Sequence, residues 1–195
     1  MDLRIERGKT TRERLVSVGF DLFGTNGYEA TPVGAILGAA GVARGAFYHH
    51  FPTKADLFDA VLDRVIARIA DASADAARAH DDPVESLRAG CSTWLDVAVD
   101  PALQRIAFLD ATAVVGWDRY RELDEQHTLG RLKTGLRRIA RAGLLPEENI
   151  EALAHMVAGA VGEAAKLIVH AKDPAEARAS GQAALDLLLT RLLKP

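Results

Sequence analysis

The sequence predicts an all-α protein in which a three-helix head is joined by a long linker helix to a five-helix body. Alanine and leucine are abundant while aromatic residues make up only 6% of the chain, a composition that favours helices over strands. Apolar residues recur three and four positions apart through most of its 195 residues. Pairs of Asp or Thr followed by Pro, which mark helix starts, divide the chain at several places. Together these observations predict helices throughout.

The head begins with a helix that we expect to start at Thr10, because Thr10 and Glu13 have the spacing of a capping box. Apolar residues at helical spacing follow. Gly27 is expected to end the segment in the left-handed conformation that glycine adopts at helix C-termini. The second helix is expected to have Thr31 as its N-cap and Pro32 at its first helical position.

Gly41 separates the second helix from a third, and two short helices with a glycine between them are typical of a helix-turn-helix. The third helix has two different faces. One face is suited to approach a polyanion and is formed, at positions i, i+1, i+4 and i+5, by Arg44, Gly45, Tyr48 and His49. The opposite face is assigned to the core of the head and is formed by Phe47, His50 and Phe51.

Pro52 ends the third helix, and Thr53 is expected to cap a fourth helix that runs from Lys54 to about residue 79. At 1.5 Å per residue this helix is on the order of 40 Å long, enough to link two parts of a protein. The predicted domains are therefore a head of residues 1–53 and a body of residues 54–195. The body helices are expected to start near residues 83, 101, 111, 147 and 174, with Gly116 as a candidate bend in the third.

Charge and cysteine content limit the function further. The net charge is −3, and Lys and Arg outnumber Asp and Glu in residues 1–54, whereas the rest of the chain as a whole is acidic, which fits a protein that offers one end to a polyanion. The single cysteine, Cys91, excludes a disulfide framework within the chain and is interpreted as a small helix residue. We recognise no signal peptide and no uncharged run that spans a bilayer. We therefore expect a cytoplasmic protein with no membrane partner, located at the nucleoid when it binds DNA.

No catalytic or metal-binding constellation is recognised in the sequence. Glu151 and His155 form a single i, i+4 pair without an obvious third ligand, and neither a nucleophile triad nor a phosphate-binding glycine loop stands out. We therefore expect no catalytic residue, metal or cofactor. Two alternatives stay open here: an all-helical enzyme with a general base among the body's carboxylates, and an architectural DNA-binding protein without a ligand. The first leaves the helix-turn-helix unexplained, and the second predicts a more basic chain with a smaller body.

Several local patterns occur together in residues 10–60: Leu22-Phe23-Gly24-Thr25-Asn26-Gly27-Tyr28, Thr31, Val33-x-x-Ile36, Ala40-Gly41-Val42-Ala43-Arg44-Gly45, Phe47-Tyr48-His49-His50-Phe51, and Lys54 with Leu57-Phe58. This combination closely resembles the tetracycline-repressor (TetR) family of bacterial transcriptional regulators. The body resembles that family in its helical architecture, and the segment from Arg105 to Asp124 is similar to one subgroup. The resemblance implies a homodimer whose two heads enter successive major grooves of a palindromic operator. It also implies a body that binds a small-molecule effector and thereby releases a repressor from DNA.

The resemblance assigns roles to the exposed face of the third helix. Arg44 is suited to donate two hydrogen bonds to a guanine, and Tyr48 resembles the phosphate-contacting tyrosine of the family. Lys54 and Thr31 lie at helix N-termini, where the helix dipole favours a phosphate. The predicted DNA-binding residues are Thr31, Arg44, Gly45, Ala46, Tyr48, His49 and Lys54.

Two alanines depart from the family's pattern. Ala43 stands where a capping serine or threonine is common, and Ala46 stands where a polar base-reading side chain is common. Ala46 is limited to an apolar contact such as a thymine methyl group. We therefore expect base readout to depend on fewer side chains than is usual in the family.

Two further sets of residues are predicted in the body. A face of small residues and a leucine-rich last helix predict a two-fold dimer interface, with packing inside one chain as the alternative. The residues of this interface are Ala154, Ala158, Gly162, Ala165, Leu185, Leu188 and Leu192. Asp110 and Trp117 would lie two turns apart on one face of a continuous helix. They belong to a set of aromatic and polar side chains that suits a ligand pocket: Trp94, Phe108, Asp110, Trp117, Tyr120, His127, His155 and Glu163.

Overall fold

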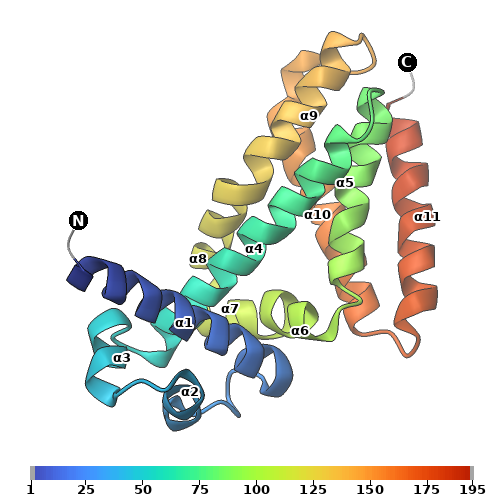
Figure 1. The fold of residues 1–195 in the computed structure, drawn as a ribbon. Coiled ribbons are helices and arrows are strands. Elements are labelled where there is room, and N and C mark those ends of the chain that lie inside the picture. Colours follow the sequence, from blue (N-terminus) through green and yellow to red (C-terminus); the bar gives the residue numbers. More distant parts are fainter. Residues whose placement is uncertain (1–2, 194–195) are drawn as a thin grey trace. The chain divides into compact units, whose positions relative to one another are not determined.

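The computed structural model describes residues 3–193, and every regular element within that range is a helix, as Figure 1 shows. The predicted all-α class is therefore confirmed. The chain forms two compact units. Unit 1 contains the residues up to Val65 together with Pro101–Tyr120, and unit 2 contains Ile66–Asp100 together with the residues from Arg121 onward. The division differs from the predicted boundary after residue 53, because the beginning of the linker helix and a segment from the body belong to the first unit.

Unit 1 is built from six helices and parts of two more. They are α1 (Leu3–Asn26), α2 (Val33–Ala40), α3 (Arg44–His50), the first half of α4 (Lys54–Arg78), α6 (Pro101–Gln104), the π-helix η1 (Arg105–Asp110), α7 (Ala111–Val115) and the start of α8 (Trp117–Asp124). Its core is formed by fully buried side chains of α1, α2, α3 and α4, among them Leu15, Phe23, Ile36, Phe47 and Phe58.

Helix α1 starts at Leu3, so the prediction that it starts at Thr10 is wrong. No proline precedes Thr10, and the residues there are mostly good helix formers, so nothing interrupts the helix before the capping-box pattern. The predicted end of the segment is confirmed. Gly27 has a φ of 85°, in the left-handed region, and its N–H donates to the Phe23 carbonyl at 2.9 Å.

Unit 2 is a helical bundle. It contains the rest of α4 and α8, α5 (Pro83–Val97), the π-helix η2 (Glu125–Leu129), α9 (Gly130–Arg141), the 3₁₀ helix η3 (Glu147–Asn149), α10 (Ile150–Val169) and α11 (Pro174–Leu192). By length and composition the segment Glu147–Val169 could cross a membrane. However, α10 packs against α5, α9 and α11 and buries a continuous stripe, so we interpret it as a core helix of the bundle; the stripe is Ala154, Val157, Val161, Ala165 and Ile168.

Two of the Asp-Pro pairs cap their helices as predicted. The carboxylate of Asp82 accepts hydrogen bonds from the N–H groups of Val84 and Glu85 at the start of α5. Asp173 does the same for Ala175 and Glu176 at the start of α11. These caps satisfy N–H groups that have no partner inside their helices.

The predicted segment from about 111 to 142 is not one continuous helix. Gly116 has φ 81° and ψ 164° and separates α7 from α8, and η2 then interrupts the path from α8 to α9. The bend predicted at Gly116 is confirmed, and the continuous helix that would place Asp110 and Trp117 on one face does not form. Glycine is the residue that adopts such a backbone without a steric penalty.

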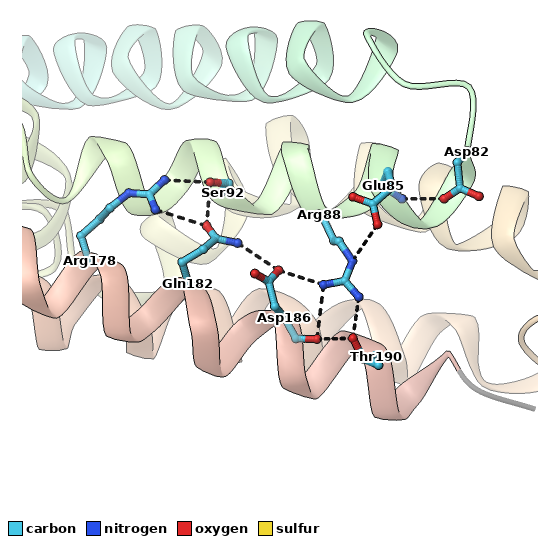
Figure 2. Close-up of polar contacts among 8 residues, drawn as sticks. All are labelled: Asp82, Glu85, Arg88, Ser92, Arg178, Gln182, Asp186 and Thr190. Carbon is cyan, nitrogen blue, oxygen red and sulfur yellow. Dashed lines mark hydrogen bonds and ion pairs between the residues drawn. The ribbon is translucent and has the colours of Figure 1, made fainter.

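A polar seam joins α5 to α11 in unit 2, and Figure 2 shows its side chains. Arg88 donates to the Asp186 carboxylate at 2.9 Å and to the Thr190 hydroxyl at 2.6 Å. Ser92 donates to the Gln182 amide oxygen at 2.7 Å, and Arg178 donates to Ser92 at 2.8 Å. Gln182 in turn donates to Asp186 at 3.1 Å, so these side chains form one connected network.

Replacing Arg88 by methionine is expected to lower the free energy of unfolding by about 1–2 kcal/mol. The change leaves Asp186 and Thr190 without a charged donor, and such bonds contribute roughly 1.5–3 kcal/mol, less where solvent reaches them. Urea unfolding followed by circular dichroism measures the change. Arg141→Ala, which removes an exposed arginine of α9, should stay within about 0.5 kcal/mol of wild type.

Cys91 is predicted to be chemically inert in the folded protein. It is 6% exposed, and burial raises the pKa of its thiol to about 12. The thiolate is the reactive form, so little of it is present near neutral pH. We expect Ellman's reagent at pH 8 to label unfolded protein in urea rapidly and folded protein only as fast as it unfolds. Equal labelling rates in both conditions would contradict this.

Candidate nucleic-acid interface

The turn between α2 and α3 has the geometry that the sequence predicts. Gly41 lies in the left-handed region, with φ 61°, and its N–H donates to the carbonyls at the end of α2. The N–H of Val42 donates to the Leu37 carbonyl at 3.2 Å. Ala43 then has an extended backbone without a side-chain cap, and α3 begins at Arg44. The local hydrogen bonds of the turn therefore set the position where α3 starts.

The two faces of α3 differ in exposure. Phe47 and Phe51 are buried, and His50 lies half-buried. Burial lowers the pKa of His50, with added effects from the neighbouring His49 and Arg12. The side chains that carry donors face solvent, including Tyr48 at 44% exposure; they are Arg44, Tyr48 and His49. Gly45 is also exposed and has no atom within 4 Å of a Cβ built on it, so a DNA backbone has space to approach there.

Thr31 has a different role from the predicted one. Its side chain is 1% exposed, and its hydroxyl is directed at the Gly27 carbonyl at 2.7 Å and the Leu22 carbonyl at 3.3 Å. The N-cap of α2 is Pro32, and no side chain caps that helix. The prediction that Thr31 caps α2 is therefore wrong. Its contact with a phosphate stays a prediction, which the burial of its side chain does not favour. Thr31 instead holds the turn that follows α1, through the short hydrogen bond from its hydroxyl to the Gly27 carbonyl.

Lys54 is placed at the N-terminus of α4 as predicted, and it also has a partner inside unit 1. Its ammonium group donates to the Tyr28 carbonyl at 2.8 Å and lies 3.9 Å from the centroid of the Tyr28 ring. The ammonium group carries three N–H donors, so the bond to Tyr28 does not prevent a second bond to a phosphate. Thr53 and Asp56 form a reciprocal capping box that fixes this end of α4, which confirms Thr53 as the cap.

Tyr28 connects three elements of unit 1. Its N–H donates to the carboxylate of Asp110 at 2.8 Å, and its ring packs edge-on against Phe58 at 5.4 Å between centroids. Arg105 lies beside the same loop, since a Cβ built on Gly27 would be 2.9 Å from its Nη1 atom. These contacts are not predicted from the sequence. No local pattern indicates them, because Tyr28 and Asp110 are 82 positions apart.

Arg12 is a second feature that the sequence analysis did not single out. The side chain is exposed, and its guanidinium carbon lies 5.1 Å from the centroid of the Phe51 ring, in a cation–π contact. This contact places a positive charge of α1 beside the C-terminal end of α3. Arg12 therefore adds to the positive charge of the head near the predicted DNA-binding face.

The predicted ligand-binding residues are divided between the two units. Phe108, Asp110, Trp117 and Tyr120 belong to unit 1, and Trp94, His127, His155 and Glu163 belong to unit 2. Three of them have surroundings unlike a pocket wall. Asp110 accepts the Tyr28 N–H; Trp117 is 60% exposed and stacks on Tyr120 at 6.2 Å; Glu163 is exposed and pairs with Lys166 at 3.4 Å.

Unit 2 contains a polar group that the sequence analysis did not identify. Asp124 is half-buried, and burial raises the pKa of its carboxyl group, an effect opposed by the neighbouring Thr128 side chain and by nearby charges that include His155. Lys133 is buried between the carboxylates of Glu125 and Glu151, at 2.8 and 2.7 Å, which raise the pKa of its ammonium group. A perturbed carboxyl beside a predicted ligand-binding histidine makes this part of unit 2 the stronger candidate for polar ligand contacts.

The predicted dimer residues fall into two groups. Ala154, Ala165 and Leu185 are buried inside the chain, whereas Leu188 is 43% exposed and Ala158, Gly162 and Leu192 are half-buried. A Cβ built on Gly162 has no atom within 4 Å, so that part of α10 has no neighbour within the described chain. Other large apolar side chains of α10 and α11 are exposed as well: Met156, Leu167 and Leu187.

Comparisons with known proteins cover both parts of the chain. A family model described as bacterial regulatory proteins of the tetR family matches residues 15–61, and one described as tetracyclin repressor-like, C-terminal domain matches residues 84–192. A TetR-family transcriptional regulator from Pectobacterium atrosepticum is 31% identical and superposes with a TM-score of 0.85 over 96% of each chain. The TetC protein of transposon Tn10 from Escherichia coli is 25% identical over 79% of this chain and 78% of its own. RolR, solved in complex with resorcinol, shares the fold at 18% identity, with a TM-score of 0.75 over 97% of this chain and 91% of its own.

Proposed function

Because the chain belongs to the TetR family of transcriptional regulators, which bind DNA and are not enzymes, we propose that it is a ligand-responsive repressor. In this proposal a homodimer binds a palindromic operator through its two α3 helices. A small molecule bound by the body then releases the dimer from DNA. The protein acts in the cytoplasm, at the nucleoid while it is bound to DNA.

The observation that carries the proposal is the asymmetry of α3. Phe47 and Phe51 anchor one face in the core, while the opposite face presents Arg44, Tyr48 and His49 to solvent. An exposed arginine near the start of a recognition helix is suited to read a guanine in the major groove. Tyr48, His49 and Lys54 would bind phosphates and so position the helix, and Ala46 would make an apolar contact.

The proposed dimer interface is the exposed apolar face of α10 and α11. Four large apolar side chains on these two helices are exposed, although such residues are usually buried; they are Met156, Leu167, Leu187 and Leu188. Gly162 leaves open space on the same helix as Met156 and Leu167, so a second helix could approach closely. A two-fold axis would bring this face against its own copy. Ala158 and Leu192 remain in the proposed interface, and the residues buried inside the chain do not contribute directly.

The proposed effector is a small molecule with both apolar and hydrogen-bonding groups. RolR, which shares the fold, was solved with resorcinol. In this chain Trp94 of unit 2, one of the predicted ligand-binding residues, would supply an apolar contact. His127, His155 and the half-buried Asp124 would supply polar ones.

Selection of duplexes from a random pool tests this function. The full-length protein is expected to enrich a palindrome with two half-sites about one helical turn apart, and a gel shift at fixed salt then gives its affinity. Addition of candidate aromatic compounds should release the duplex, and a reporter gene behind it should be expressed less when the protein is present. Binding that depends on salt but shows no sequence preference would support an architectural protein instead.

A further inference from the structure

We propose that the segment Pro101–Tyr120 supports the DNA-binding site, and that Asp110 is a positioning residue that holds Lys54 through Tyr28. The inference rests on the proposed function, because it concerns how strongly Lys54 binds a phosphate of the DNA. It assigns a DNA-related role to a stretch of the body that lies far from the helix-turn-helix in sequence.

Asp110 is bonded to the backbone of Tyr28. The Asp110 carboxylate accepts the N–H of Tyr28 at 2.8 Å in a partly buried position. A hydrogen bond with an ionised acceptor is stronger than a neutral one, so this bond fixes the backbone just after α1. Asp110 is the last residue of the π-helix η1, and π-helical turns often occur at functional positions.

Tyr28 in turn contacts Lys54 through its carbonyl and its ring. The carbonyl of Tyr28 accepts a hydrogen bond from the Lys54 ammonium group at 2.8 Å, and the Tyr28 ring lies under the same group at 3.9 Å. Tyr28 is therefore held by Asp110 through its N–H and holds Lys54 through its carbonyl and its ring. Lys54 is the first residue of α4, where the helix dipole adds to the attraction for a phosphate.

The segment Pro101–Tyr120 contacts α1 and α4 at further points. Arg119 forms a two-point ion pair with Asp59 of α4, with N···O distances of 2.8 and 3.1 Å. Gly24 lets α6 approach α1 closely, since a Cβ built on it would be 2.9 Å from the Cβ of Ala102. These contacts attach the segment to the end of α1 and to the first turns of α4. Those are the two helix ends that Tyr28 connects.

A double-mutant cycle of Asp110→Ala and Lys54→Met tests the proposal on the duplex that the wild-type protein selects. Dissociation constants are measured at several NaCl concentrations, and thermal unfolding is recorded for each variant. Each lost phosphate contact lowers the slope of log K against log salt by about 0.9, so a dimer that loses two contacts changes by about 1.8. We expect this change for Lys54→Met and much of it for Asp110→Ala, with little further change in the double variant.

Two further variants distinguish the positioning of Lys54 by Asp110 from a general effect of removing a negative charge and from a loss of folding. Asp118→Ala removes an exposed carboxylate from the same unit without touching Tyr28, and it should keep the wild-type slope. Asp110→Asn keeps an acceptor for the Tyr28 N–H and should bind DNA better than Asp110→Ala. If Asp110→Ala does not fold, Asp110→Asn replaces it in the cycle. The smaller loss of DNA affinity caused by Asp110→Asn should then be absent when Lys54 is already replaced by methionine.

Three results would overturn the inference. One is a wild-type salt slope for a folded Asp110→Ala protein, even if its melting temperature falls, because that is the result of a purely structural role. Another is a wild-type slope for Lys54→Met. The third is that the Asp110 variant loses the same DNA affinity whether residue 54 is lysine or methionine. If the wild-type protein selects no duplex at all, the proposed function itself fails, which distinguishes the two failures.

Discussion

Replacing Arg44 by alanine is expected to weaken binding of the selected duplex by about 30-fold or more and to remove the preference for the base pair that Arg44 reads. A bidentate arginine–guanine contact contributes about 1–3 kcal/mol of discrimination, and a dimer makes the contact twice. Two such losses amount to at least about 2 kcal/mol, and 1.4 kcal/mol corresponds to a factor of ten. Arg44 is exposed, so the fold and the dimer should be unaffected.

Competition gel shifts with the selected duplex, single-base variants and random duplex measure this effect at one salt concentration. Arg141→Ala is the matched control, because it removes an exposed arginine from α9 and leaves the head unchanged. Sedimentation at the same concentrations checks that both variants keep the oligomeric state of the wild type. If Arg44→Ala still discriminates the operator from random duplex as the wild type does, Arg44 is not the base-reading residue.

Replacing Gly162 by leucine is expected to dissociate the proposed dimer while each chain keeps its fold. A Cβ at this position meets no atom within 4 Å in the chain, so the larger side chain has room in a single protomer. A partner helix packed closely at that point would be displaced. Overpacking costs about 1–3 kcal/mol, and two-fold symmetry applies that cost twice, so the dimer should be weakened by a factor of about 30 or more.

The matched control for this change is Gly130→Leu. Gly130 is also a helical glycine with no atom within 4 Å of its built Cβ, and it lies on α9, outside the proposed interface. Sedimentation equilibrium at several concentrations should show a weaker dimer for Gly162→Leu alone, with a parallel loss of operator affinity. A dimer of unchanged strength would show that α10 does not form the interface at Gly162.

The features that the sequence predicts correctly are those set by residues close together in the chain. The left-handed Gly27, the turn at Gly41 and the caps by Asp82 and Asp173 depend on a few neighbours each. The buried positions of Phe47 and Phe51 follow from helical spacing in the same way. Short-range rules of this kind were sufficient to predict the helix-turn-helix and the helical body.

The features that the sequence analysis missed depend on contacts between distant residues. Thr31 looked like a helix cap, but tertiary packing directs its hydroxyl at the end of α1. Asp110 looked like a pocket residue, whereas its carboxylate accepts an N–H from a loop 82 positions away. Ala154 and Leu185 share helix faces with exposed or half-buried residues, and only the packing of the bundle shows that they are buried. Periodicity identifies an apolar face without identifying which neighbour covers it.

The polar seam between α5 and α11 also fixes how α11 is positioned along α5. Apolar side chains tolerate sliding of one helix along another, because one leucine can replace another in the contact. Directional bonds tolerate it poorly: a shift of α11 by one turn, about 5.4 Å, would move Asp186 away from Arg88 and Arg178 away from Asp96. The seam therefore selects one rotational and translational setting of α11, and that setting determines that Leu187 and Leu188 are the leucines that face outward.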